Sequence, residues 1–115
     1  MASRKVKLNP YRVWLHFHDN VEAFEKASGC KLDDFVGGAV SKPVHGHMHM
    51  YLPIEDGSVS IPDLAHESFH VADSIFDYTG VDLQYNTGNE HMAYLIGFVV
   101  ESVLDMVYSI TKGNK

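Results

Sequence analysis

The chain has 115 residues, of which 45% are hydrophobic and 21% charged, and its formal net charge is −6. These proportions are those of a globular protein with a packed core, and they exclude a disordered chain. The length predicts a single domain over residues 1–115, because a second core would be too small to bury its apolar surface.

Charge is distributed unevenly along the chain. Residues 44–110 contain no Lys or Arg, although ten of the 15 acidic residues and six of the eight histidines lie there. Affinity for nucleic acid depends on cations that displace phosphate counterions, so we expect no nucleic-acid partner for this region. Carboxylates combined with imidazoles are suited to a divalent metal ion instead.

Three features bear on location. Cys30 is the only cysteine, so it cannot form an intrachain disulfide, and this favours a reducing compartment. The N-terminal segment lacks the uninterrupted apolar run of a signal peptide, since Asn9-Pro10 and His16 interrupt it. The longest apolar run, residues 92–100, is about half of the roughly 20 residues that span a bilayer. We therefore expect a cytoplasmic protein with no membrane partner.

The first half of the chain predicts two extended segments and one helix. Residues 11–18 (YRVWLHFH) are rich in aromatic and β-branched side chains, which favours a strand. Asp19-Asn20 then predicts the start of a short helix, and Gly29 its end. Residues 39–52 alternate again, and Pro43 and Gly46 within them indicate an edge strand or a bulge.

Three histidines lie in that second extended segment. In one continuous strand His45, His47 and His49 would share a face, because side chains alternate between the two sides of a strand. A metal site is one interpretation of them. The other is a half-buried edge strand whose methionines point inward and whose histidines are in water.

The second half predicts two helices. Ser60 to Asp63 has the spacing of a capping box with Pro62 in the first turn, so a helix should run from about residue 61 to residue 78 and end at Gly80. Residues 89–110 repeat apolar side chains with a helical period. The expected fold class is therefore α+β, a small sheet with an edge strand over the first of these helices, which packs against the long C-terminal helix.

The first predicted helix carries the motif HESFH at residues 66–70. Positions four apart lie on one face of a helix, so His66 and His70 can bind one ion. Glu67 points to the side, where a general base can touch a water without becoming a metal ligand. Two histidines on a helix without any metal are the alternative.

A catalytic zinc takes three protein ligands, so another is needed. Glu90 lies near the start of the next predicted helix, and Ala93 and Gly97 on its stripe are small enough to let the two helices approach closely. Glu90 could instead be a helix cap, because residues 87–90 also have capping-box spacing.

Two other residues compete for the third position, namely His91 and Asp73. Asp73 lies on the stripe of His66 and His70, and we favour an outer role for it, in which it orients an imidazole. Asp77 lies on the same stripe and is a weaker candidate for this role.

HESFH followed by NEHMAY resembles the zincin metallopeptidases, in the branch whose third ligand is a glutamate on the following helix. The resemblance covers about residues 44–110 and is greatest to small phage and bacterial proteins with a minimal zincin core. It implies zinc as the cofactor, with His66, His70 and Glu90 as ligands and Glu67 as general base. It also implies that an extended peptide or protein substrate pairs with an edge strand, here within residues 45–52.

This chain departs from that pattern in two ways. Many members of the branch have an aspartate four residues after the ligand glutamate, where this chain has Tyr94, and the chain is shorter than typical members. We therefore carry two expectations of function. The first is a zinc-dependent peptidase, and the second is a non-catalytic metal-containing protein that binds a host protein, as a small phage effector would.

Overall fold

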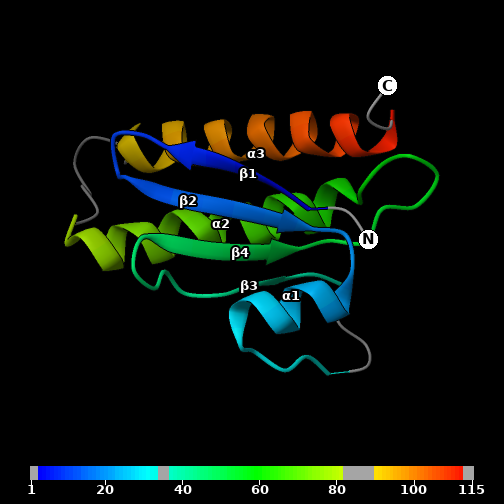
Figure 1. Ribbon diagram of the computed structural model, residues 1–115. Coiled ribbons are helices and arrows are strands. Elements are labelled where there is room, and N and C mark those ends of the chain that lie inside the picture. Colours follow the sequence, from blue (N-terminus) through cyan, green and yellow to red (C-terminus); the bar gives the residue numbers. More distant parts are fainter. Residues whose placement is uncertain (1–2, 34–36, 82–89, 113–115) are drawn as a thin grey trace.

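The computed structural model describes residues 3–33, 37–81 and 90–112 (Figure 1). It is a compact α+β fold with a four-stranded mixed sheet in the order β1-β2-β4-β3. The strands are β1 (Ser3–Leu8), β2 (Val13–His18), β3 (Ala39–Val40) and β4 (His47–Tyr51). The helices are α1 (Val21–Ser28), α2 (Ile61–Thr79) and α3 (Glu90–Thr111).

The two faces of the sheet carry different side chains. Strands β2 and β4 are parallel neighbours, and their apolar side chains, among them Leu15, Phe17 and Met48, are fully buried in one core with residues of α2 and α3. Figure 1 shows α2 passing behind these two strands. Helix α1 packs on the other face, where the Phe24 ring contacts the rings of His18 and Tyr51.

Strand β1 was not predicted from the sequence. It pairs antiparallel with β2 and also contacts α3. A hydrogen bond from Arg4 Nε to Ser109 Oγ, 3.1 Å long, joins the start of β1 to the last turns of α3. The first strand and the last helix therefore lie together at one side of the molecule.

The predicted single strand over residues 39–52 is two strands. β3 and β4 are antiparallel, and the bridge between Val44 and His47 encloses a two-residue turn. Both turn residues have positive φ, 51° at His45 and 79° at Gly46, as tight hairpin turns require. The prediction that His45 shares a face with His47 and His49 is therefore wrong, because His45 lies in the turn.

The edge of the sheet also differs from the prediction. We expected the edge strand within residues 45–52, but β3 ends the sheet on that side and β4 is an inner strand. The backbone N–H of Ser41 donates to the carbonyl of His49 at 2.8 Å, and that of Val44 donates to the carbonyl of His47 at 2.8 Å. These carbonyls of β4 are occupied by the protein's own chain.

The predicted helices are confirmed, and their ends have the expected causes. The Ser60 side chain accepts a hydrogen bond from the backbone N–H of Asp63, and Gly80 ends α2 in the left-handed conformation with φ of 75°. Asn20 caps α1 in the same way and Gly29 ends it. The capping box expected at residues 87–90 falls mostly outside the described residues.

Helix α3 is more apolar than its longest uninterrupted run suggested. By length and composition alone it could cross a membrane, with a mean hydropathy of 1.6 over its most apolar stretch. Core helices pass the same test, and Leu95, Val99 and Val103 are buried in the core of this fold. The expected absence of a membrane partner stays a prediction.

Candidate metal centre on helix α2

His66, Glu67 and His70 form a group on α2, which we call the α2 cluster. One possible ligand atom from each lies within 4.8 Å of the others. The Nε2 atoms of His66 and His70 are 3.1 Å apart, and both side chains are exposed. Two nitrogens bound tetrahedrally to zinc at about 2.0–2.1 Å would be about 3.3 Å apart. The two imidazoles could therefore hold a divalent metal ion, such as zinc, with only a small shift.

Glu67 lies at the inner side of this cluster. Its residue is only 8% exposed, and one carboxylate oxygen is 3.9 Å from His66 Nε2. Burial raises the pKa of Glu67, although both histidines act to lower it. A carboxylate with a raised pKa is a better proton acceptor at neutral pH than an ordinary surface glutamate. Its position suits either a general base or a third ligand.

Glu67 is held under the edge of the sheet. A Cβ added to Gly38 would lie 3.1 Å from Glu67 Cγ and 2.7 Å from a methyl carbon of Leu52, so only glycine fits there without a shift. The chain at residues 37–38 therefore packs directly on Glu67, and the adjoining β3 contacts α2.

Glu90 is not a member of the α2 cluster. Helix α2 continues beyond His70 for about 14 Å, at roughly 1.5 Å per residue, before it ends at Thr79. Figure 1 shows α2 and α3 running antiparallel, with the start of α3 on the same side as the end of α2. Glu90 is exposed on the first turn of α3. Its role as a ligand stays a prediction.

The small residues beyond Glu90 do not form a helix contact. Ala93 and Gly97 are exposed, and a Cβ added to Gly97 would meet no atom within 4 Å. The prediction that they let α3 approach α2 closely is therefore wrong. Buried residues such as Leu95 and Val99 take part in the core instead, because they lie on a different stripe of α3.

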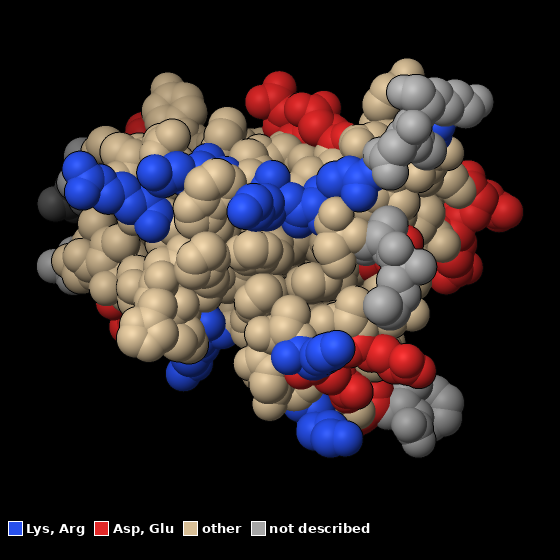
Figure 2. Space-filling model, viewed as in Figure 1, with Lys and Arg blue, Asp and Glu red and all other residues tan. Residues whose placement is uncertain are grey.

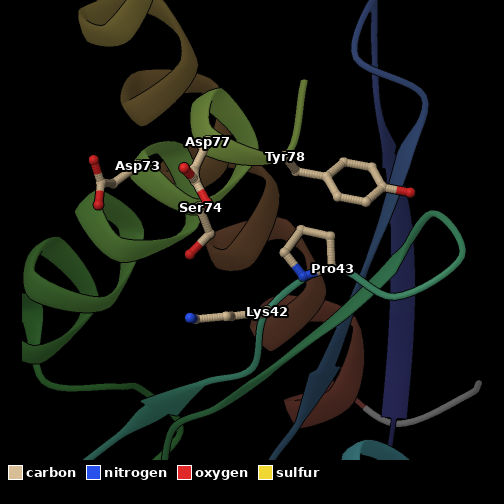
Figure 3. A pocket seen from close by; sticks show the side chains of 6 residues that line it. All are labelled: Lys42, Pro43, Asp73, Ser74, Asp77 and Tyr78. Atoms are coloured by element: carbon tan, nitrogen blue, oxygen red, sulfur yellow. The ribbon is translucent and has the colours of Figure 1, made fainter. Parts of the chain in front are cut away.

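The other candidate ligands are also outside the cluster. His91 is exposed on α3. Asp73 and Asp77 line a hollow of about 340 Å³ between α2 and the chain at Lys42 and Pro43 (Figure 3). Among the described residues Asp73 is thus a wall of this hollow rather than a partner of either imidazole.

A second hollow lies on the other side of the cluster. It measures about 410 Å³ and is lined by Gly37, Glu55 and Asp63 among others. Residues 37–43 thus run beside α2, over Glu67 in the middle, with an acidic hollow toward each end. We call the line along which residues 37–43 meet α2 the seam. It could not be predicted from the sequence, because it depends on where β3 packs.

Four histidines gather on the face of the sheet opposite α2, and we call them the sheet histidines: His16, His18, His47 and His49. The Nε2 of His16 is 2.8 Å from Nδ1 of His47, and the Nε2 of His18 is 3.0 Å from Nδ1 of His49. The rings of His16 and His49 are stacked with centroids 4.7 Å apart. Of this group, only His47 and His49 were predicted from the sequence as a possible metal site.

Three of the sheet histidines, His16, His18 and His49, resist protonation. Burial, followed by the neighbouring His49, His47 and Lys5, lowers the pKa of His16 from 6.5 to about 4. Burial also lowers the pKa of His18 and of His49, with further contributions from adjacent histidines. These three rings are therefore neutral at pH 7.

We expect stability to fall as the pH is lowered from about 6.5 to about 4. In that window the unfolded chain binds a proton at His16 that the folded chain does not bind, so acid favours unfolding. Urea unfolding at a series of pH values measures this. Carboxylates also titrate there, so the control is His16→Gln, whose stability should depend less steeply on pH. Equal slopes for the two proteins would contradict the assignment.

The fold and the α2 cluster define a small α+β protein with an HExxH helix beside a sheet edge. No protein-family model, curated protein or solved structure matches the chain.

Proposed function

We propose that this protein is a zinc-dependent metallohydrolase that cleaves a peptide or amide bond, built as a minimal zincin core. The observation that carries the proposal is the 3.1 Å separation of the two Nε2 atoms, with the buried Glu67 carboxylate beside them. His66 and His70 would hold the ion. Glu90 is the third ligand that the resemblance implies, and Glu67 is the general base.

The residues of the cluster divide the chemistry between them. Zinc in such a site acts as a Lewis acid that makes water nucleophilic near neutral pH. A Glu67 carboxylate oxygen accepts the proton of the attacking water and passes it to the leaving amine. Packing of Gly38 against Glu67 Cγ restricts the side chain that bears this carboxylate, which favours the proton transfer.

The substrate would lie along the seam between α2 and residues 37–43. β3 ends the sheet on this side, so an extended peptide can pair with its outer edge. The hollows on both sides of Glu67 are acidic, with Asp63 and Glu55 in one and Asp73 and Asp77 in the other. We therefore expect basic side chains on the substrate, although Lys42 opposes them in the second hollow.

The test is hydrolysis of a library of unstructured peptides by zinc-loaded protein. We expect cleavage products with Lys or Arg near the cut, and less cleavage when Glu replaces those positions. Mass spectrometry identifies the bonds that are cut. Cleavage of acidic peptides in preference to basic ones would contradict the proposed substrate, and cleavage of no peptide would count against a peptidase.

A non-catalytic metal-containing binding protein is the second candidate function. Tyr94 and Tyr108 on α3 are 73% and 64% exposed, and exposed aromatic side chains are typical of protein interfaces. A structural zinc is closed by four protein ligands. A metal site that leaves no position for water would favour this candidate.

A further inference from the structure

The sheet histidines form two pairs stacked on each other. Strands β2 and β4 are parallel, with His16 directly opposite His49, so the pairs form diagonally across the two strands. One pair is His16 with His47 and the other is His18 with His49. The separation of the first pair, 2.8 Å, is close to the 3.1 Å of the two imidazoles on α2.

We propose that the sheet histidines bind a second divalent late transition metal ion, of the Ni²⁺, Cu²⁺ and Zn²⁺ group, between His16 Nε2 and His47 Nδ1. Imidazole nitrogen is the ligand type that these ions prefer. The site lies on the opposite face of the sheet from α2, so it stands or fails independently of the proposed hydrolase.

The protons of this pair can be placed without charging either ring. In the metal-free pair one nitrogen donates its N–H to the lone pair of the other. On binding, the donor ring moves that proton to its other nitrogen, so both facing nitrogens present lone pairs. Neutral imidazole is the form that binds metal.

The second pair holds the first in place. The Oγ of Ser3 is 2.8 Å from Nδ1 of His18, whose Nε2 reaches His49, and His49 stacks on His16. This chain of contacts fixes ring orientations from β1 across to β4, as outer partners do in metal sites. The hollow of about 350 Å³ beside His47 and His49 leaves room for water to complete the coordination.

The surrounding charge sets a limit on affinity. Figure 2 shows a band of Lys and Arg over β1, while the surface over β2 and β4 below it carries mostly neither acidic nor basic side chains. The positive charge of Lys5 helps to lower the pKa of His16, and Lys42 lines the hollow beside His47 and His49. These cations oppose a metal ion, so we expect a weaker site than a carboxylate-assisted one.

The experiment uses the full chain with His66→Ala and His70→Ala, so that the α2 cluster is removed. Calorimetric titration with Ni²⁺ should find about one ion per chain. Adding His47→Asn should weaken binding by at least roughly 10–100-fold, the loss that even an outer partner causes. Adding His91→Asn is the matched control, because His91 is an exposed histidine on α3 and does not line this hollow.

The result that overturns the proposal is absence of Ni²⁺ binding in the double variant, or equal binding after His47→Asn. Ring-nitrogen NMR with Zn²⁺ gives a second readout that does not depend on these variants. Shifts at His16 and His47 support the site, whereas shifts confined to His45 or His91 contradict it. Circular dichroism of each variant checks that it is folded.

Discussion

Replacing Glu67 with Gln is expected to lower turnover by about 10²- to 10⁴-fold while zinc stays bound. Gln keeps the shape of the side chain but cannot accept a proton at neutral pH. The buried position of Glu67 under Gly38 should be kept, because the two side chains have nearly the same volume. The measurement is the rate of peptide cleavage together with zinc content per chain.

The matched control for this variant is Glu101→Gln, which makes the same change at an exposed position on α3. It should leave both rate and zinc unchanged. Two outcomes would show a wrong assignment of Glu67. A variant that cleaves as fast as the wild type removes Glu67 as the base, and one that loses its zinc makes Glu67 a ligand.

Substituting the imidazoles of α2 is expected to remove zinc. His66→Ala and His70→Ala each remove one of two nitrogens that lie 3.1 Å apart. Loss of an outer partner lowers metal affinity by roughly 10–100-fold, so loss of either ligand should lower the affinity for zinc by well over that factor. Both residues are exposed and Ala favours helix, so the fold should persist. Zinc titration by competition with a chelating dye measures the change.

The third ligand is decided by the same titration on Glu90→Gln. This change exchanges an anionic ligand for a neutral amide, so the affinity for zinc should fall if Glu90 binds the ion. His91→Ala is the companion variant, because His91 is its neighbour and a rival for the position. Unchanged zinc affinity in Glu90→Gln would show that Glu90 is not the third ligand. A loss of zinc affinity in His91→Ala alone would make His91 the third ligand.

The helices could be predicted from the sequence because their signals are local. Ser60, Pro62 and Gly80 determine both ends of α2 within a few residues, and the spacing of HESFH places two imidazoles on one face. The class of fold followed from these helices and from the alternation of β2. The third metal ligand could not be predicted from the sequence, since its identity depends on where α3 begins relative to α2.

The sheet was harder to predict because pairing between distant strands leaves no local signal. The turn at His45-Gly46 was hidden by alternation that continues on both sides of it, and β1 looked like a basic N-terminal segment. One signal was available, however. WLHFH and HMHMY both place histidine at every second position, so each strand has a histidine face, and parallel pairing brings the two together.

The contact between the first strand and the last helix determines what can fold alone. Residues 44–110, which include the HESFH and NEHMAY motifs, contain β4, α2 and all but the last residue of α3, but neither β1 nor β2. Leu8, Leu15 and Phe17 from those strands are fully buried against the rest of the core. A fragment limited to residues 44–110 would expose its apolar side of α2 and α3 to water. We therefore expect this fragment to aggregate rather than fold with HESFH on a stable helix. Transfer of the motif to another protein would have to include strands β1 and β2.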